Sequence, residues 1–359
     1  MAIPTPSPLQ ADDRADQQPQ QALQQAPATP VAATMQAIVQ AAYGIAAEDV
    51  LRLDDVARPV IAADQILVRI RAASVDRGTW HAMAGLPYPV RLAGFGLRAP
   101  KATNPGRSFA GVVESAGKDV TEFKPGDEVY GTCDGSFAQF ASTRAGKIAL
   151  KPANLTFEQA AAVPVSALTA LQAVRDQAKV QPGQQVLIIG ASGGVGTFAV
   201  QIAKSLGGEV TGVCSTAKAD LVRSVGADHV IDYTSADFAD GEHRYDVIID
   251  TGGNRPLAHL RRALTARGTL VIVGGETDGR WLGGTDRQLR ALVLTPMVSQ
   301  KLGTFMASEN SADLMVLRDL IESGAVTPAV DRAYPLAQTA AAIRQVQEGR
   351  ARGKVVITI

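Results

Sequence analysis

The stretch VLIIGASGGVGTFAVQIAKSLG, residues 186–207, decides the fold of this chain. Its apolar start suits a strand that is buried on both faces, and its second half suits a helix. The loop between them follows the pattern G-x-G-x-x-G, with alanine in the first glycine position. Between a buried strand and a helix, this pattern is typical of a dinucleotide-binding site, and an ordinary glycine-rich turn is the alternative.

The physical requirements of a dinucleotide site assign a role to each part of this loop. Glycines let the backbone approach a pyrophosphate, and the amino end of the helix attracts its negative charge. Gly196 in addition lets the helix pack closely on the sheet. We therefore expect the cofactor to contact Ser192, Gly193, Gly194, Val195 and Gly196.

Strand-like and helix-like runs alternate downstream of this loop. Apolar runs at 209–215, 229–233, 245–253 and 269–275 are separated by runs of helical composition, such as 256–266. This alternation predicts an α/β fold with a doubly wound parallel sheet and right-handed crossovers.

The rest of the chain has a different pattern. Residues 35–160 read as short strands separated by turns, and 66–75 alternates apolar and polar side chains at period 2. This part predicts a small, irregular β-barrel. The last stretch, 329–359, reads as strand, helix and strand, and we expect it to pack back onto the barrel.

These patterns divide the chain into four parts. Residues 1–34 are rich in Gln, Ala and Pro, and we expect a disordered tail without a secretory signal there. We expect the N-terminal segment of a catalytic domain at 35–160, a cofactor-binding domain at 161–308, and a C-terminal segment that returns to the catalytic domain at 309–359.

Composition excludes several classes of protein. The 35 basic and 35 acidic residues give a net charge of zero, without the basic excess of a nucleic-acid-binding protein. No apolar run approaches the roughly 18 residues that span a bilayer. Only two cysteines are present, Cys133 and Cys214, which excludes a disulfide framework and a cysteine-built zinc lobe. We expect a cytoplasmic protein that acts on a small molecule.

The end of the second strand favours NADPH over NADH. An NAD site usually has a carboxylate there for the ribose 2′-hydroxyl, whereas this chain reads GVCSTAK at 212–218. The hydroxyl of Ser215 and the ammonium of Lys218 suit a 2′-phosphate, and Tyr233 ends the next strand within reach of the same group. The alternatives are a solvated lysine and a packed aromatic ring.

Further motifs accompany the glycine loop. They are AASVDRGTWHAMAG (72–85), PGRSFAGVVESAG (105–117), FKPGDEVYG (123–131), VPVSALTALQAV (163–174) and GRARGKVVITI (349–359). Together they resemble the medium-chain dehydrogenase/reductase superfamily, and most closely its zinc-independent quinone oxidoreductase branch. The resemblance implies a GroES-like β-barrel in two chain segments around a Rossmann domain, NADPH between the two domains, and a homodimer.

The chain departs from the zinc-dependent members of that superfamily. They hold a catalytic zinc with a cysteine, a histidine followed by glutamate, and a third ligand; the matching positions here are Asp76, Arg107 with Ser108, and about Val165. Because arginine cannot be deprotonated, it cannot be a ligand, and we expect no metal. Without a Lewis acid, quinones and α,β-unsaturated carbonyl compounds (enones) are the natural hydride acceptors.

The segment after the strand at 66–75 supplies the catalytic candidates. Asp76 either orients a ribose hydroxyl or caps a short helix at 77–84. His81 either protonates an enolate or quinol oxygen or is a partly exposed helix residue. Tyr88 either supplies the proton or forms the apolar wall of a pocket.

The resemblance adds three residues to the expected cofactor site. Thr169 matches a position that contacts the nicotinamide ribose or phosphate, and a buried helix threonine is the alternative. Gly274 ends the fifth strand, where the backbone should face the nicotinamide. Lys354 matches a lysine at the cofactor cleft, or is a surface lysine.

Two other functions remain open from the sequence. One is a stand-alone enoyl reductase of a biosynthetic pathway, and the other is a non-catalytic NADPH-binding protein. For assembly, the run KLGTFMAS at 301–308 predicts a sixth strand at the sheet edge, through which two copies would pair into a homodimer.

Overall fold

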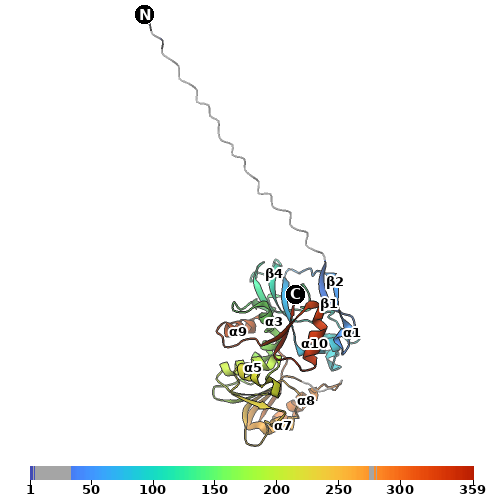
Figure 1. The fold of residues 1–359 in the computed structure, drawn as a ribbon, viewed down its shortest axis with the longest axis vertical. Helices are drawn as coiled ribbons and strands as arrows, with labels where there is room; N and C mark the ends of the chain where they lie inside the picture. Colours follow the sequence, from blue (N-terminus) through green and yellow to red (C-terminus); the bar gives the residue numbers. More distant parts are fainter. Residues whose placement is uncertain (3, 5–33, 275–278, 280) are drawn as a thin grey trace. The chain divides into compact units, whose positions relative to one another are not determined.

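The computed structural model describes residues 1, 2, 4, 34–274, 279 and 281–359 (Figure 1). The predicted tail at 1–34 lies outside the described residues, apart from Met1, Ala2, Pro4 and Thr34. Among the described helices, none combines the length and apolarity that a membrane span requires.

A parallel sheet forms the centre of the cofactor-binding half. Among the described residues its strands follow the order β10-β9-β8-β11-β12-β13, which is the strand order of a doubly wound dinucleotide-binding fold. The prediction of such a sheet is confirmed. Its strands are β8 (Gln185–Ile189), β9 (Glu209–Cys214), β10 (His229–Asp232), β11 (Tyr245–Asp250), β12 (Leu264–Ile272) and β13 (Lys301–Thr304).

Strand β8 is buried on both faces because helices cover both sides of this sheet. Val186 and Ile188 belong to the same apolar core as Phe198 of α5, whereas Leu187 belongs to a second core with Leu260 of α7. The helices of this half are α4 (Pro164–Leu171), α5 (Gly194–Ser205), α6 (Ala219–Ser224), α7 (Leu257–Ala263) and α8 (Thr285–Leu294), together with the later helix α9 (Ser311–Glu322).

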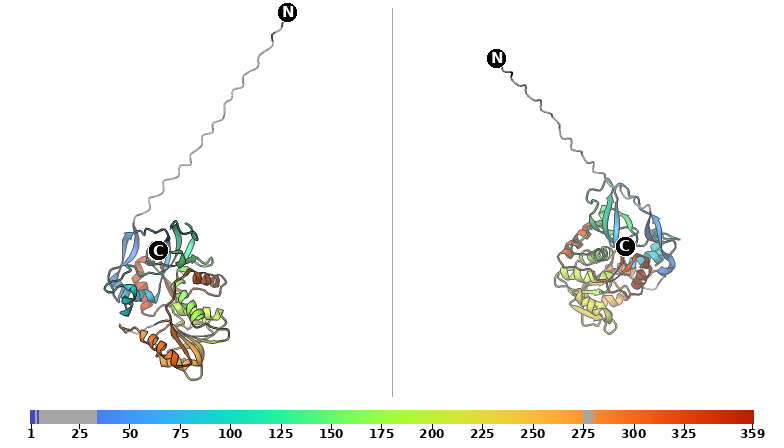
Figure 2. Two further views of the ribbon diagram at one scale, coloured as in Figure 1. Left: turned by 180° about the vertical axis from the view of Figure 1, so that it is seen from behind. Right: turned by 45° about the horizontal axis from the view of Figure 1, so that its top comes forward.

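The second sheet joins distant parts of the chain. Its strand order is β14-β15-β3-β4-β5-β7, with β6 also paired to β3, and β15 runs antiparallel to β3 with Val355 opposite Val75. Figures 1 and 2 show this red C-terminal strand beside the blue and green ones, so the barrel is built from two chain segments. Its strands are β3 (Ile66–Val75), β4 (Ser108–Ala116), β5 (Glu128–Thr132), β6 (Phe140–Thr143), β7 (Ile148–Leu150), β14 (Val330–Pro335) and β15 (Lys354–Thr358).

Smaller elements complete the barrel half. The antiparallel pair β1 and β2 contacts the segment just before β6 through a bridge between Ala37 and Ala138. These elements are β1 (Thr34–Gln40), α1 (Ala47–Val50), β2 (Leu51–Ala57), α2 (Arg77–Ala84), α3 (Phe157–Ala161) and α10 (Thr339–Gln347). Single turns of helix lie at Arg91–Phe95, Ala145–Lys147, Gln172–Gln177, Thr216–Lys218, Thr295–Met297 and Leu336–Gln338.

One predicted element is shorter than expected. The edge strand predicted at 301–308 ends at Thr304, because the ladder with β12 pairs only Lys301 to Thr304. Met306 therefore lies beyond the strand and is highly exposed.

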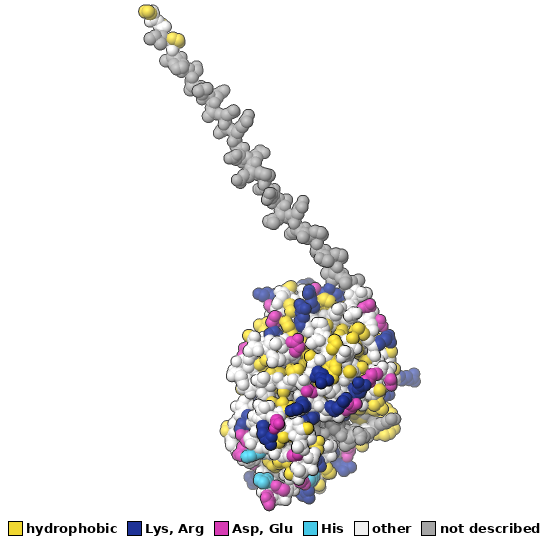
Figure 3. All heavy atoms as spheres, in the orientation of Figure 1, with side chains coloured by type: hydrophobic (Ala, Val, Ile, Leu, Met, Phe, Trp, Pro, Cys, Tyr) yellow, Lys and Arg dark blue, Asp and Glu magenta, His cyan; other side chains and the backbone are white. Residues whose placement is uncertain are grey.

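On the face shown in Figure 3, basic and acidic side chains are interspersed rather than gathered by sign.

Candidate active site

The glycine loop makes a tight turn between β8 and α5. Gly190 has a φ of +79°, and its carbonyl oxygen accepts a hydrogen bond of 3.0 Å from the backbone N–H of Gly193. A Cβ atom at Gly196 would lie 2.1 Å from that same oxygen, so only glycine allows α5 to start this close to the strand. At Gly194 a Cβ would lie 3.0 Å from the Lys354 side chain. The loop is thus a backbone cradle at the amino end of a twelve-residue helix, which suits a pyrophosphate.

Asp76 and Lys354 meet directly beside this cradle. The Asp76 carboxylate accepts hydrogen bonds from the Lys354 ammonium, from Ser166 Oγ at 2.6 Å and from Ser108 Oγ at 3.1 Å. The ammonium also donates to Ser166 Oγ at 3.0 Å and to the Val75 carbonyl at 3.3 Å. The Lys354 side chain is only 1% exposed, so the surface-lysine alternative is wrong.

The position of Asp76 also agrees with the helix-cap alternative. Asp76 is the N-cap residue of α2, and its backbone N–H donates to Thr79 Oγ1 at 3.2 Å. Its carboxylate is committed at the same time to Lys354 and two serines. Ser108 and Ser166 therefore belong to the site, although the sequence analysis assigned them no part in it.

The loop before β15 contacts the cofactor half twice. The Gly353 N–H donates to the Ser192 carbonyl at 2.9 Å, within the glycine loop. Lys218 Nζ donates to the carbonyls of Gly349 and Ala351 at 2.7 and 2.8 Å. Burial lowers the pKa of Lys218. Lys218, which is predicted to bind the 2′-phosphate, is therefore also hydrogen-bonded to the loop at 349–353.

Ser215 and Tyr233, the other residues predicted to bind the 2′-phosphate, follow the neighbouring strands β9 and β10. Ser215 directly follows β9, and Tyr233 follows β10 with its N–H bonded to the Cys214 carbonyl at 3.1 Å and its side chain 49% exposed. Asp232, at the end of β10, accepts hydrogen bonds from the hydroxyls of Thr216 and Thr234. This carboxylate was not anticipated from the sequence, because it ends the third strand rather than the second.

Burial favours the neutral form of His81. Its Nδ1 lies 2.8 Å from the carbonyl oxygen of Leu86, which can only accept, so Nδ1 carries a proton. Burial lowers the pKa of His81 and the neighbouring charge of Arg77 adds to this effect, whereas the hydrogen bond to Leu86 opposes it. In the neutral form Nε2 is an acceptor, so the predicted proton donation needs a prior protonation of His81.

Tyr88 belongs to a group of aromatic side chains. Its ring lies 5.2 Å from that of Trp281 in an edge-on arrangement, and the Arg91 guanidinium lies 5.0 Å from its centre. Tyr88 and Arg91 also line a hollow of about 150 Å³ with Tyr43 and Leu86. The predicted pocket wall and proton source both stay open for Tyr88.

A buried ion pair fixes the strand ends where the nicotinamide is expected. Asp250, the last residue of β11, pairs with Arg287 of α8 at 2.9 Å, and both side chains are buried. Arg287 also donates to the Gly274 carbonyl at 3.1 Å. Neither partner was anticipated. Thr169 donates to the Val165 carbonyl within α4 at 2.7 Å and is only partly buried, so its predicted contact with the cofactor stays a prediction.

The residues at the zinc-ligand positions do not fit a metal. Arg107 forms a forked ion pair with Glu309, at 3.0 and 2.6 Å, and a further contact with Asp134 at 2.7 Å. Burial opposes the charge of Glu309, but the hydrogen bonds and charge of Arg107 lower its pKa overall. The carboxylate of Asp76 is already paired with Lys354, and Arg107 cannot coordinate a metal.

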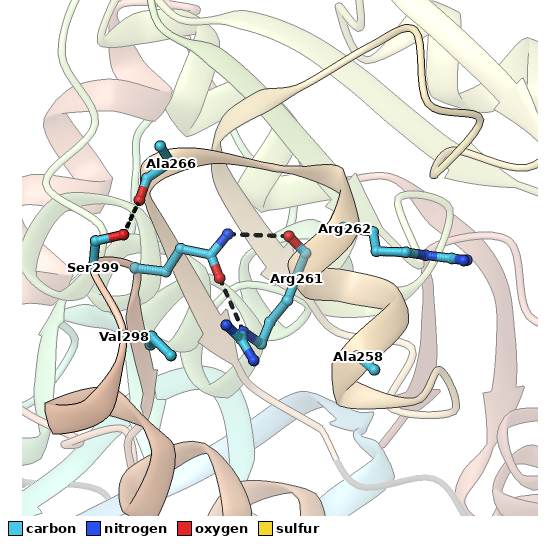
Figure 4. A pocket seen from close by; sticks show the side chains of 7 residues that line it. Ala258, Arg261, Arg262, Ala266, Val298 and Ser299 are labelled. Atoms are coloured by element: carbon cyan, nitrogen blue, oxygen red, sulfur yellow. Dashed lines mark hydrogen bonds between the residues drawn. The ribbon is translucent and has the colours of Figure 1, made fainter.

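Two other features lie apart from this site. A hollow of about 370 Å³ is formed by α7 and the chain just before β13, at the amino ends of strands rather than at the carboxyl ends where dinucleotides bind (Figure 4). Among the described residues, Asp240, Glu242 and His243 form an exposed cluster that could hold a metal, and it precedes β11 far along the chain from Asp76.

Two family models match the chain. One is described as an alcohol dehydrogenase GroES-like domain and matches residues 62–173. The other is described as a zinc-binding dehydrogenase and matches residues 225–357. The second match includes β14 and β15 of the barrel sheet as well as the later strands of the parallel sheet.

Individual proteins match over most of their length. A 2-methylene-furan-3-one reductase from Solanum lycopersicum is 34% identical over 325 residues, covering 86% of this chain and 76% of the relative. A chloroplastic NADPH-dependent alkenal/one oxidoreductase from Arabidopsis thaliana is 31% identical, covering 90% and 79%. The solved structure of the quinone oxidoreductase from Coxiella burnetii has a TM-score of 0.77 at 27% identity, covering 91% of this chain and 99% of that one. Fold, glycine loop and relatives agree, and the chain belongs to the zinc-independent, quinone oxidoreductase-like branch of the medium-chain dehydrogenase/reductase superfamily.

Proposed function

We propose that this protein is an NADPH-dependent oxidoreductase that reduces quinones or α,β-unsaturated carbonyl compounds. The observation that carries the proposal is the pairing of Asp76 with Lys354 beside the glycine loop. Where related enzymes keep a metal, this chain has two ion pairs, the second being that of Arg107 with Glu309. The site therefore suits acceptors whose conjugation delocalises the charge that hydride addition creates.

The residues expected to hold NADPH come from both halves of the fold. The backbone of 192–196 at the start of α5 suits the pyrophosphate, and Lys218 with Ser215 suits the 2′-phosphate. When bound, NADPH supplies the hydride, and the acceptor takes one proton in the same two-electron reduction. His81, Tyr88 or water is the candidate source of that proton.

Lys354 and Asp76 contribute by fixing the geometry of the site. Their hydrogen bonds connect β3, α4 and β15, and the adjoining Gly353 N–H holds the Ser192 carbonyl. Together these hydrogen bonds hold the glycine loop and the start of α2 in one arrangement. Helix α2 bears His81. Preorganisation of this kind is what hydride transfer requires of a protein.

Steady-state oxidation of NADPH with quinones, enones and enoyl thioesters tests the proposal. We expect turnover with quinones or enones. Turnover confined to enoyl thioesters would instead favour a biosynthetic enoyl reductase, and tight NADPH binding without any turnover would favour a non-catalytic binding protein.

Two further properties belong to the proposal. We infer a homodimer formed through the edge strand β13. We also propose that the protein is cytoplasmic. The Arabidopsis relative is named as chloroplastic, so subcellular fractionation is the test.

A further inference from the structure

An aromatic and cationic row runs from the barrel half to the segment before α8. The Arg91 guanidinium lies between the rings of Tyr43 and Tyr88, at 4.3 and 5.0 Å from their centres. Its Nε donates to the Gly85 carbonyl at 2.8 Å. The Tyr88 ring also meets the indole of Trp281, at 5.2 Å between ring centres and an angle of 74°. Tyr88 is therefore in contact with both Arg91 and Trp281.

A second contact fixes the same two segments against each other. Gly283 has a φ of +52°, and a Cβ atom there would lie 2.9 Å from Pro87 Cγ. Glycine alone thus allows Pro87 to pack on the backbone at this point. Because Pro87 and Tyr88 are neighbours, the two contacts together set the position of Trp281 relative to Tyr88.

The segment of Trp281 is also tied to the edge of the parallel sheet where the nicotinamide is expected. Arg287, in the first turns of α8, donates to the carbonyl of Gly274 and pairs with Asp250 at the end of β11. Trp281 lies only six residues before Arg287 in the chain. The indole contacts Tyr88, and the chain that follows it is fixed by Arg287 at the carboxyl ends of β11 and β12.

Trp281 is 74% exposed in spite of these contacts. A large, solvent-exposed aromatic ring beside the candidate catalytic residue Tyr88 offers a flat, electron-rich face to a ligand. We propose that Trp281 is a specificity-determining residue on which the ring of a quinone stacks, so that cyclic quinones rather than open-chain enals are the preferred acceptors. This inference rests on the proposed function and narrows its substrate class.

Electronic complementarity supports the choice of quinones. A quinone ring is poor in electrons and indole is rich in them, so an offset stack is favourable, whereas an open-chain enal has no ring to stack. Tyr88, fixed by Arg91, would set the edge of the stacking surface. Reduction of the bound quinone takes a hydride from NADPH and one proton, and gives the hydroquinone and NADP⁺.

The kinetic test compares two acceptors in the full chain. Trp281→Ala, Trp281→Phe and wild type are assayed with NADPH and either 1,4-naphthoquinone or trans-2-hexenal. We expect Trp281→Ala to lower kcat/KM for the quinone roughly three- to tenfold, through KM. Trp281→Phe should retain most of the quinone activity, and hexenal kinetics should not change. Met315→Ala, at an exposed apolar residue of α9, is the control and should change neither.

A binding measurement complements the kinetics. With NADP⁺ bound there is no turnover, and a quinone on Trp281 should quench tryptophan fluorescence in a saturable way. The Trp281→Phe variant retains only Trp80, so its saturable quenching should be much weaker than that of wild type. Equal kinetic losses for both acceptors, or undiminished saturable quenching in Trp281→Phe, would overturn the inference. Wild-type turnover with hexenal but not with naphthoquinone would also overturn it while leaving the proposed function intact; turnover with neither would refute the function itself.

Discussion

The Lys354 ammonium and the Asp76 carboxylate form a buried ion pair between residues 278 positions apart in the chain. Lys354 begins the last strand, and Asp76 directly follows the strand that lies beside it. Ser166, from the start of the cofactor-binding half, donates to the same carboxylate. One cluster of polar groups therefore joins both segments of the barrel to the glycine loop.

Breaking this pair should cost much of the stability of the protein. Lys354→Met leaves the Asp76 carboxylate buried with only two serine donors, and a buried charge without its partner costs about 3–5 kcal/mol. Urea unfolding should show this loss. The double variant Asp76→Asn/Lys354→Met removes both charges and should recover more than half of it. A single-variant loss under about 1 kcal/mol would mean that the pair is not buried in solution.

Stability should fall as the pH drops through the range in which histidine titrates. The pKa of His81 is lowered in the folded state by burial, so the unfolded chain, with a pKa near 6.5, binds more protons. Unfolding therefore becomes easier between about pH 7 and pH 5. His81→Asn keeps a donor for the Leu86 carbonyl and should reduce this pH dependence. Thermal unfolding at pH 5 and pH 8 measures it, and identical pH dependence in the two proteins would contradict the burial of His81.

Lys218 should control the choice between NADPH and NADH. Loss of a charge-assisted contact to the 2′-phosphate costs about 1.5–3 kcal/mol, so Lys218→Ala should weaken NADPH binding roughly 10- to 150-fold. NADH binding should change far less. Lys218→Arg, which keeps the charge, is the control. Because Lys218 also holds the carbonyls of Gly349 and Ala351, an equal loss for both cofactors would assign it to loop positioning alone.

Local features of the fold could be predicted because they depend on neighbouring residues. The alternation at 66–75 and the helix at 77–84 match β3 and α2 residue for residue, since the change of period and the capping residue Asp76 mark the boundary. The edge strand was predicted too long because apolar residues continue after Thr304 although pairing with β12 stops there. The sequence pattern of one strand does not show how many of its residues pair with the neighbouring strand.

The partners of buried charges could not be predicted in this way. Asp250 and Arg287 are 37 residues apart, and Arg107 and Glu309 are 202 apart. Neither the composition nor the hydrophobic periodicity of the sequence connects such distant positions. Within its own stretch of sequence, each of these charged residues resembles an ordinary surface residue. The resemblance to a family pointed to Asp76 and Lys354 singly, but only the fold brings them together.

Enzymatic activity should survive exhaustive chelation. Arg107 is engaged by Glu309 and cannot be a ligand, and Lys354 occupies the carboxylate of Asp76. Dialysis against a strong chelator should leave NADPH oxidation unchanged, and elemental analysis should find no stoichiometric zinc. A zinc-dependent alcohol dehydrogenase treated in parallel is the control for complete metal removal. One zinc per chain, lost together with activity, would contradict this prediction.

The protein should form a dimer through β13. Among the described residues no strand pairs with the outer side of β13, although the backbone N–H and carbonyl of Leu302 are hydrogen-bonded to Thr295 Oγ1, and sheet edges favour pairing with a second copy. Exposed apolar side chains on the adjacent α8, among them Leu289 and Val293, would be covered at the same time. Light scattering reports mass independently of shape, and should give twice the mass of the chain at micromolar concentration. Thr304→Pro removes a backbone donor within β13 and should yield monomers. Proline at Met306, just beyond the strand, removes no donor of β13 and should leave the dimer in place. A wild-type monomer, or dissociation by the Met306 change but not by the Thr304 change, would show that β13 does not carry the interface.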